Sequence, residues 1–579
     1  MSTSSLEVEK KKTSAAEKVS GSEAVLKCLL EENVEVIFGY PGGAIMPIYD
    51  ALYGYMDRLN HILTRHEQGA VHAAQGYARV TGKTGVCFAT SGPGATNLIT
   101  GIADAQIDST PLVCITGQVF STLLGTDAFQ ETDVVGISMP VTKWNYQVTR
   151  ADEIPYAIAK GFYIANSGRP GPVLIDITKD AQLAMMEEAF AYQKCEKIRS
   201  YHPYPSVEAS AVKAAAELIN SAKKPMLLVG QGVLIAEAQK ELITFAEKAG
   251  IPMASTLMGL SAVPNNHPLY VGYLGMHGNY GPNVKTNECD VLIAVGMRFD
   301  DRVTGNLSKY AKQAKVVHIE IDPAEINKNV KADAPVNADA KEALQALIKL
   351  TEPNSHESWV QEFRDCDEVE FDKIIKKAIA PESGGLQMVE VMKKISDKTK
   401  GKSILVTDVG QHQMVASRYY AFDDTRSNVT SGGLGTMGFA LPAAMGAKMG
   451  QPDRQVIAVI GDGGFQMTIQ ELGTIFQSNI GVKILILNNN FLGMVRQWQE
   501  LFHDKRYSFT ELTNPNFQKI AEGYGIPTNK VETRELLDDA LDQWLSADGP
   551  QLLEVVVEKE ENVFPMVPSG ASVSDIRLE

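Results

Sequence analysis

What this sequence lacks already narrows the kind of protein that it forms. No apolar run approaches the ~18 residues that a membrane-spanning helix needs. The six cysteines are scattered without a Cys-x-x-Cys pair, so we expect buried free thiols and a reducing compartment. Basic residues are too few for a nucleic-acid-binding face, because 54 lysines and arginines stand against 70 acidic residues, a net charge of -16.

The N-terminal segment also lacks the hydrophobic stretch of a secretory signal. Residues 1–20 combine lysines with serine, threonine and glutamate, which predicts a disordered, solvated tail. The glutamates are unlike a transit peptide, in which acidic residues are rare. We therefore expect a cytoplasmic protein.

Apolar runs of strand length, many of them rich in β-branched residues, alternate with helical patterns along the chain. This alternation predicts parallel sheets covered by helices. The clearest runs lie at 36–38, 111–115, 172–176, 225–229, 291–295, 316–320, 455–459 and 482–486.

The length of 579 residues exceeds the roughly 250–300 residues at which a single core stops growing. Two stretches rich in charge and proline, 186–206 and 351–385, are typical of linkers. We therefore expect an α/β fold with three doubly wound parallel-sheet domains, at 21–185, 207–350 and 386–579.

An aspartate flanked by glycines, directly after a strand-like run, carries the strongest chemical signal. A Gly-Asp-Gly segment alone is most often a turn, but here a helical pattern follows 461–464, and the next strand, 482–487, ends in three asparagines. The carboxyl ends of neighbouring parallel strands share one edge of a sheet. Asp462, Asn489 and the backbone carbonyl of Phe491 could therefore supply oxygen ligands to Mg²⁺, while the glycines let the backbone approach a diphosphate.

This arrangement resembles the diphosphate-binding domain of thiamine-diphosphate (ThDP) enzymes, which carry Gly-Asp-Gly and Asn-Asn at about this spacing. The resemblance implies ThDP, Mg²⁺ and a second α/β domain that binds the aminopyrimidine ring. It implies that 21–185 is the pyrimidine-binding domain and that 386–579 is the diphosphate- and Mg-binding domain with a C-terminal tail.

A glutamate at the end of a short apolar strand is the candidate that activates the cofactor. Glu67 follows the strand-like run at 62–64 and starts a helical pattern, where an isolated glutamate is most often explained by the helix dipole. The run Arg-His-Glu-Gln-Gly-Ala at 65–70 is similar to the family's motif. In that family the glutamate bonds pyrimidine N1′ and favours the imino tautomer, whose nitrogen removes the proton of thiazolium C2.

The resemblance covers almost the whole chain after the tail and narrows to the acetohydroxyacid synthase (acetolactate synthase) catalytic subunits. It rests on runs such as Thr-Ser-Gly-Pro-Gly-Ala-Thr-Asn at 90–97, Arg-Phe-Asp-Asp-Arg-Val-Thr-Gly at 298–305 and Phe-Pro-Met-Val-Pro-Ser-Gly at 564–570. This family decarboxylates pyruvate and transfers the hydroxyethyl unit to pyruvate or 2-ketobutyrate. The products, 2-acetolactate and 2-aceto-2-hydroxybutyrate, lead to valine, leucine and isoleucine.

The resemblance also implies site residues. Catalytic or substrate-binding roles fall to Glu67, Gln130, Lys179, Arg302 and Trp498. Contacts with ThDP fall to Tyr40, Pro41, Gly42, Glu67, Val409, Gly410, Gln411, His412, Gly435, Met437, Gly461, Asp462, Gly463, Gly464, Asn489 and Met494. Contacts with a bound FAD fall to Arg169, Thr256, Leu257, Gly275, Met276, His277, Gly296, Arg298, Glu320 and Asp339.

Several of these residues have ordinary alternative explanations. Arg302 would bind the 2-keto-acid carboxylate through its guanidinium fork, although an arginine beside an aspartate is more often a surface ion pair. Trp498 would select 2-ketobutyrate over pyruvate, whereas a tryptophan on a helix face is usually a core residue. The Gly-Gln-Gly segment at 230–232 is only half of a dinucleotide fingerprint, so FAD rests mainly on the resemblance.

The family further implies a homodimer or tetramer with its active site at the subunit interface, and a regulatory small subunit. This sequence departs from better-known members of the family at Phe120, where those members have proline. The alternatives are a FAD-free catabolic acetolactate synthase, another ThDP-dependent carboligase, or a catalytically silent nucleotide-binding regulatory protein.

Overall fold

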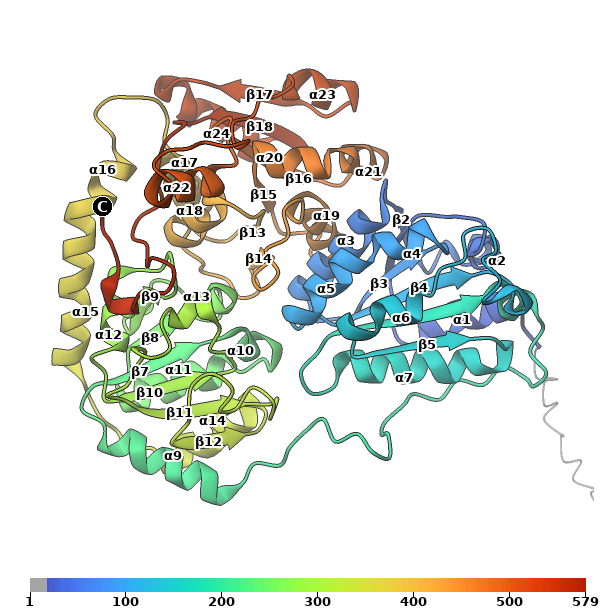
Figure 1. The fold of residues 1–579 in the computed structure, drawn as a ribbon, viewed down its shortest axis with the longest axis horizontal. Coiled ribbons are helices and arrows are strands. Elements are labelled where there is room, and N and C mark those ends of the chain that lie inside the picture. Colours follow the sequence, from blue (N-terminus) through green and yellow to red (C-terminus); the bar gives the residue numbers. More distant parts are fainter. Residues whose placement is uncertain (1–17) are drawn as a thin grey trace, which may run out of the picture.

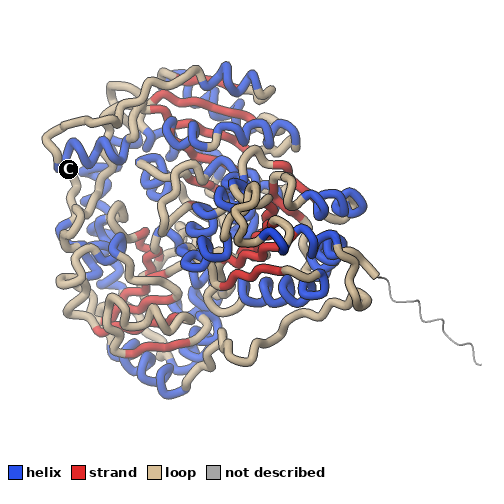
Figure 2. The backbone as a smooth tube through the Cα atoms, turned by 45° about the vertical axis from the view of Figure 1, so that its right-hand side comes forward, coloured by secondary structure: helices blue, strands red, loops and turns tan. Residues whose placement is uncertain are grey.

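The structure, a computed structural model, describes residues 18–579 and contains three six-stranded parallel sheets with interleaved helices (Figure 1). The predicted α/β fold with three parallel-sheet units is confirmed. Each of the eight strand-like runs overlaps a strand of one of these sheets. Figure 2 shows the strands of the sheets lying side by side among the helices.

The N-terminal sheet has the order β2-β1-β3-β4-β6-β5. Its strands are β1 (Val36–Gly39), β2 (Asn60–Leu63), β3 (Gly85–Ala89), β4 (Leu112–Gln118), β5 (Trp144–Val148) and β6 (Pro172–Thr178). Its helices are α1 (Gly21–Glu31), α2 (Met46–Leu52), α3 (Glu67–Thr81), α4 (Pro93–Asn97), α5 (Ile99–Ile107), α6 (Val134–Ser138), α7 (Ile154–Asn166) and α8 (Lys179–Leu183).

The middle sheet has the order β12-β11-β10-β7-β8-β9. Its strands are β7 (Pro225–Val229), β8 (Met253–Ser255), β9 (Tyr270–Tyr273), β10 (Val291–Val295), β11 (Lys315–Glu320) and β12 (Ala334–Asn337). Its helices are α9 (Ala209–Ser221), α10 (Gln231–Ile235), α11 (Gln239–Ala249), α12 (Tyr280–Thr286), α13 (Asp301–Thr304) and α14 (Ala340–Leu350).

The C-terminal sheet has the order β14-β13-β15-β16-β18-β17. Its strands are β13 (Ile404–Thr407), β14 (Asn428–Thr430), β15 (Val456–Gly461), β16 (Val482–Asn488), β17 (Thr528–Val531) and β18 (Gln551–Val556). Its helices are α17 (Met388–Thr399), α18 (Gln411–Tyr419), α19 (Ala440–Gly450), α20 (Asp462–Met467), α21 (Leu472–Gln477), α22 (Gly493–Phe502), α23 (Phe517–Gly523) and α24 (Leu537–Ser546).

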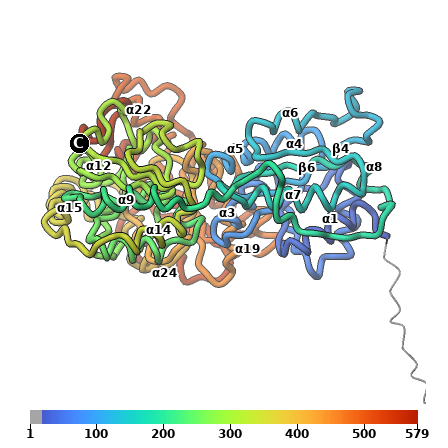
Figure 3. The backbone as a smooth tube through the Cα atoms, turned by 90° about the horizontal axis from the view of Figure 1, so that it is seen from below, coloured from blue at the N-terminus to red at the C-terminus, as the bar shows by residue number. Residues whose placement is uncertain are grey.

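Two connections join the three units. Residues 186–206 form a long irregular segment that runs from the N-terminal unit to α9, as Figures 1 and 3 show. Residues 351–385 are largely helical, with α15 (Glu357–Glu370) and α16 (Lys376–Ile379) joined by a π-helical turn. Trp359 and Phe363 of α15 are buried against the middle unit, so this connection is part of the packed structure.

Residues 1–17 of the predicted tail lie outside the described residues. Val19 is buried, and Ser20 caps α1 with a hydrogen bond to the backbone of Glu23, so the packed chain includes residues before 21. All six cysteines are described, four of them are buried, and none forms a disulfide. From residue 18 onward, no helix has both the length and the apolar character to cross a membrane.

A close helix–helix contact joins the N-terminal and C-terminal units. Helices α3 and α19 pack in one hydrophobic core that includes residues of both units. A Cβ atom at Gly76 would lie 1.9 Å from the carbonyl oxygen of Ala443, and one at Gly446 would lie 1.7 Å from that of Ala73. The two helices can approach this closely only because glycine stands at these positions.

We predict that Gly446→Ala lowers the free energy of unfolding by at least about 1–3 kcal/mol, the usual cost of overpacking a core. The added methyl group would meet backbone, which cannot move aside as a side chain can. Thermal unfolding followed by circular dichroism measures the change. The matched control is Gly523→Ala, since a Cβ atom there meets nothing within 4 Å; equal melting temperatures for the two variants would contradict the prediction.

Candidate active site

The candidate metal site lies at one edge of the C-terminal sheet. Parallel pairing places Thr407 beside Val459 and Gly461 beside Leu487, so the chain leaves β13, β15 and β16 at the same edge. Asp462 follows β15 directly, and Asn489 follows β16. The helix expected after residue 464 begins earlier, at Asp462, and a short 3₁₀ turn separates it from α21.

The Asp462 carboxylate is almost fully buried, with 1% of the residue exposed. Its Oδ2 accepts a hydrogen bond of 2.6 Å from Asn514 Nδ2, which also contacts the Oδ1 atoms of Asn488 and Asn490 at 3.0 Å. Burial raises the pKa of Asp462 to about 6. A buried carboxylate at this edge is therefore a group whose charge a bound cation would stabilise.

The other two candidate metal ligands lie beside it in the same turn. The backbone N–H of Phe491 donates to Asn489 Oδ1 at 3.1 Å, and both residues are buried. Asn489 Nδ2 points towards Gln411 Oε1 at 3.4 Å. A carboxylate, an amide oxygen and a backbone carbonyl form an all-oxygen donor set, which fits Mg²⁺.

A histidine with an unpaired nitrogen lies beside this edge. The His412 ring is buried, and its Nε2 has no hydrogen-bond partner among the described residues. Cβ atoms at Gly410 and Gly461 would lie 2.8 and 2.9 Å from its Cε1 atom. Burial lowers the pKa of His412 to about 4, so the ring is neutral at pH 7. The unpaired nitrogen and the two glycines fit a diphosphate group that comes close to the backbone.

A large cavity runs from the middle unit to the C-terminal unit, with a volume of about 840 Å³. All ten residues expected to contact FAD line it: Arg169, Thr256, Leu257, Gly275, Met276, His277, Gly296, Arg298, Glu320 and Asp339. So do seven further candidates from the sequence: Val409, Gly410, Gly435, Met437, Met494, Arg302 and Trp498. The structure thus brings together residues from three separate regions of the chain.

The part of this cavity in the middle unit fits a dinucleotide. Glu320 ends β11, where the acidic residue that contacts a ribose is expected, and burial raises its pKa to about 7. The buried Nδ1 of His277 has no partner among the described residues. Gly275 and Gly296 have positive φ angles of 121° and 57°, which larger residues rarely adopt. The volume lies within the about 300–1,000 Å³ that is typical of ligand pockets.

The surroundings of Arg302 and Trp498 bear on the alternative explanations of these residues, a surface ion pair and a core residue. Both line the cavity. The Arg302 side chain is also 63% exposed and lies 3.5 Å from Asp301, an ion pair too weak and exposed to define its role. The Trp498 ring packs against Phe502, with centroids 4.9 Å apart.

A separate cluster surrounds Glu67 in the N-terminal unit. Glu67 starts α3, is 8% exposed, and accepts a hydrogen bond of 3.0 Å from Asn97. A Cβ atom at Gly94 would lie 3.1 Å from Glu67 Oε1. A Cβ atom at Gly42 would touch Thr90, and one at Gly92 would lie 2.9 Å from the carbonyl oxygen of Gln130. The turn between β3 and α4 therefore lies next to Gly42, Glu67 and Gln130.

This cluster and the cavity are separate in the described chain. Of the candidates in the N-terminal unit, Arg169 lines the cavity. The other six do not: Tyr40, Pro41, Gly42, Glu67, Gln130 and Lys179. Lys179 starts α8, and its Nζ lies 5.9 Å from the centre of the Phe120 ring. One chain thus carries the candidate metal site in its C-terminal unit and the candidate catalytic acid in its N-terminal unit.

Sequence analysis missed two buried carboxylates that shape these sites. Asp408 directly follows β13 and accepts hydrogen bonds from the backbone N–H groups of Gly438 and Ala440, both at 3.0 Å. Glu471 accepts from the backbone N–H of Arg65 at 3.1 Å, two residues before Glu67. The position of Asp408 after a predicted strand could have revealed it; nothing in the sequence marks Glu471.

Comparison with known proteins gives matches to all three units. The family models described as thiamine pyrophosphate enzyme N-terminal TPP binding domain, central domain and C-terminal TPP binding domain match residues 19–137, 212–347 and 408–555. Thiamine pyrophosphate is another name for ThDP.

Curated relatives match over nearly the full length. The acetolactate synthase large subunit of Corynebacterium glutamicum is 45% identical, over 98% of this chain and 91% of that protein. The acetolactate synthase isozyme 2 large subunit of Escherichia coli is 46% identical, over 96% and 99%. The probable acetolactate synthase large subunit of Methanocaldococcus jannaschii is 45% identical, over 96% and 95%.

We predict that Asp462→Asn stabilises the metal-free protein. Because burial raises the pKa of this carboxyl to about 6, its ionisation above pH 6 destabilises the folded state, by up to about 3 kcal/mol. The amide removes this penalty and can still accept from Asn514. The penalty builds up between the ordinary pKa of 3.8 and the folded-state pKa of about 6, so the gain should be full at pH 8 and about half as large at pH 5.

Thermal unfolding in a chelator at both pH values measures this difference. The exposed Asp453 supplies the control variant, Asp453→Asn, which should leave the melting temperature unchanged. A lower melting temperature for Asp462→Asn at pH 8 would show that the buried charge does not destabilise the metal-free protein.

Proposed function

We infer that this chain, which belongs to the acetolactate synthase large-subunit family of thiamine pyrophosphate enzymes, joins two 2-keto acids with loss of one carboxyl group. It is a ThDP-dependent enzyme. Pyruvate loses CO₂, and its two-carbon unit is transferred to a second pyruvate or to 2-ketobutyrate, giving 2-acetolactate or 2-aceto-2-hydroxybutyrate. Identity of 44–46% over nearly the whole chain is the observation that carries this function.

When bound, ThDP supplies the thiazolium carbon at which the carboxyl group is lost and from which the two-carbon unit is transferred. Asp462, Asn489 and the Phe491 carbonyl would hold Mg²⁺. The diphosphate would be held by Gln411, His412 and the glycines at 461, 463 and 464. The pyrimidine and thiazolium rings would be held by Val409, Gly410, Gly435, Met437 and Met494 of the same unit, and by Tyr40, Pro41 and Gly42.

The remaining candidates would act on protons and substrate. Glu67 would hold a proton at pyrimidine N1′, with Gln130 close to the reacting carbon. Arg302 would bind the substrate carboxylate, and Lys179 would lie along the substrate channel. Trp498 would form a wall of the acceptor pocket, where one indole can distinguish an ethyl from a methyl group.

The middle unit would hold FAD. All ten expected contacts line a single cavity with the glycines and the acidic strand end that a dinucleotide needs, which supports FAD over the FAD-free alternative. A yellow purified protein with a flavin absorption spectrum would test this. The proposed domains are 21–185 for the pyrimidine, 207–350 for FAD and 386–579 for diphosphate and metal, with linkers at 186–206 and 351–385.

The proposed active unit is a homodimer, which could pair further to a tetramer. Glu67 and its neighbours do not line the cavity of their own chain, so the Glu67 cluster of a second copy would complete each site. A regulatory small subunit is a proposed partner, and the cytoplasm is the proposed location. An assay of CO₂ release and of products from mixed 2-keto acids, with and without ThDP and Mg²⁺, tests the reaction itself.

We predict that Glu67→Gln lowers kcat for CO₂ release by about 10²–10⁴-fold, the usual contribution of a positioned acid or base. Glutamine can still accept from Asn97 but cannot exchange a proton with pyrimidine N1′. The affinity for ThDP should change little. The control is Glu35→Gln, an exposed glutamate of the same unit that pairs with Lys83. A kcat near that of the wild type would remove Glu67 from the mechanism.

We predict that Trp498→Leu keeps the formation of 2-acetolactate but loses the preference for 2-ketobutyrate. The two acceptors differ by one methylene, which is worth about 1–3 kcal/mol, or roughly 10–200-fold. Product ratios in a mixture of pyruvate and 2-ketobutyrate measure the preference. Phe476→Leu, an exposed aromatic residue of the same unit, serves as the control; an unchanged ratio for Trp498→Leu would assign selection to another residue.

A further inference from the structure

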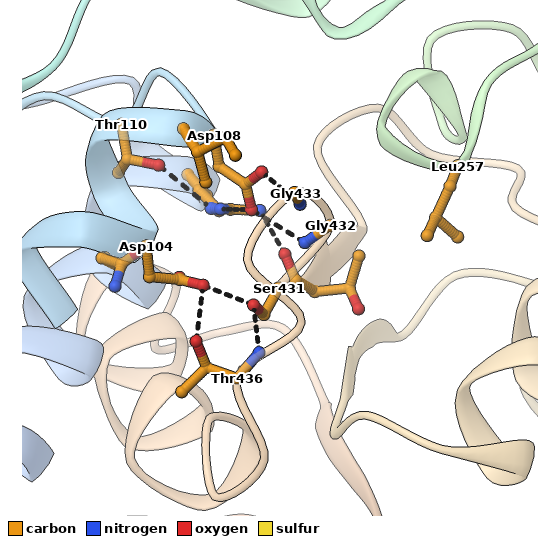
Figure 4. A network of polar contacts seen from close by, with 12 residues as sticks. Asp104, Asp108, Thr110, Leu257, Ser431, Gly432, Gly433 and Thr436 are labelled. Carbon is orange, nitrogen blue, oxygen red and sulfur yellow. Dashed lines mark hydrogen bonds and ion pairs between the residues drawn. The ribbon is translucent and has the colours of Figure 1, made fainter. Parts of the chain in front are cut away.

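Two aspartates of the N-terminal unit bind a loop of the C-terminal unit (Figure 4). Asp104 lies on α5, and Asp108 follows its end. Asp104 Oδ1 accepts hydrogen bonds from the hydroxyls of Ser431 and Thr436, the latter at 2.9 Å. Asp108 accepts from the backbone N–H groups of Gly432 and Gly433, at 2.8 and 2.7 Å. We call residues 431–437 the clamped loop.

The guanidinium of Arg79 completes this contact. Its Nη2 donates to Asp108 Oδ2 at 2.8 Å, and its Nη1 donates to the carbonyl oxygen of Thr430, just before the clamped loop. Within the loop, the backbone N–H of Thr436 donates to Ser431 Oγ at 2.8 Å, which closes the loop on itself. One cation and two carboxylates thus hold a segment that belongs to another sheet.

Burial makes this contact selective for one loop conformation. Asp104 is 0% exposed and Asp108 is 2% exposed. Buried carboxylates destabilise a protein unless donors satisfy them, and most of the donors here come from the clamped loop. A displaced loop would leave two carboxylates buried with fewer donors, so other loop conformations are disfavoured.

The clamped loop also forms a wall of the cavity. Residues 431–435 and Met437 line it, and so does Asp108. Gly435 has a φ of 69°, and a Cβ atom there would lie 3.9 Å from Val409. Directly after the loop, Gly438 is held by Asp408. The loop is therefore fixed at its end by its own unit, and along its length by the N-terminal unit.

We propose that Asp104 and Asp108 are positioning residues for the cofactor: by holding the clamped loop, they set the main chain at Gly435 and the side chain of Met437 against which the organic rings of ThDP bind. This inference rests on the proposed function. Asp104 does not line the cavity, and neither aspartate lies at the candidate diphosphate edge, which is formed by Asp462 and its neighbours. Their loss should therefore weaken binding of the rings but not of the diphosphate.

The test compares two ligands of the same protein. The dissociation constant of ThDP is measured with Mg²⁺ by tryptophan fluorescence, and that of inorganic pyrophosphate by competition with ThDP. Asp108→Asn replaces a carboxylate oxygen by an amide that cannot accept from Gly432, Gly433 and Arg79 together. We expect ThDP to bind about tenfold more weakly or worse, and pyrophosphate to bind within about twofold of the wild type.

Further variants keep the inference testable if Asp108→Asn fails to fold. Thr436→Val removes one hydroxyl without changing the shape of the side chain and should weaken ThDP binding about threefold or more. Asp104→Asn keeps Oδ1 as an acceptor and should bind ThDP better than Asp104→Ala. The control is Asp176→Asn, an equally buried aspartate that accepts from Thr116, Gln118 and Gln147 and does not touch the loop; its ratio of the two dissociation constants should not change.

Each outcome decides the matter. Selective loss of ThDP affinity supports the inference. Unchanged ThDP affinity in the loop variants overturns it, and so does an equal loss of ThDP and pyrophosphate affinity, which would show general damage to the site. A wild-type protein that binds neither ligand would instead contradict the proposed function.

Discussion

Parallel strand pairing is the constraint on which the rest of this structure depends. In a parallel sheet, all strands deliver their carboxyl ends to one edge, and the loops at that edge can share a ligand. Asp408, Asp462 and Asn489 follow β13, β15 and β16 in this way. The same holds in the other sheets, where Thr256 follows β8 and Glu320 ends β11.

Contacts between the units then fix the positions of these sheet edges relative to one another. Glycines bring α3 and α19 so close that their backbones nearly touch, and Arg79, Asp104 and Asp108 bind the loop after β14. These contacts are buried, and several hydrogen bonds cross them, which makes the placement of the units specific. The cavity lies where the three units meet, since residues 107–109 and 168–170 of the N-terminal unit line it together with residues of the other two units.

The sequence predicted those features whose signal is local. Asp462 and Asn489 stand at strand ends that are visible as apolar runs, and the three sheets follow from the alternation of such runs with helical patterns. Asn514 and Asp104 could not be found, because each acts through side-chain contacts with residues far away in the chain: the Asp104–Ser431 bond joins residues separated by 327 positions. The charged residues of 351–385 predicted a linker. In the structure this stretch contains α15, which buries Trp359 and Phe363.

The central claim is that the catalytic acid and the metal edge are two halves of one site, supplied by different copies of the chain. Glu67→Gln and Asp462→Asn should each be inactive alone, because each removes one half. In a mixed dimer purified through two different tags, both changes fall in one site and the other site is intact, so about half of the wild-type activity should return. A mixed dimer as inactive as its parents would show that both halves act within a single chain, which would contradict the account.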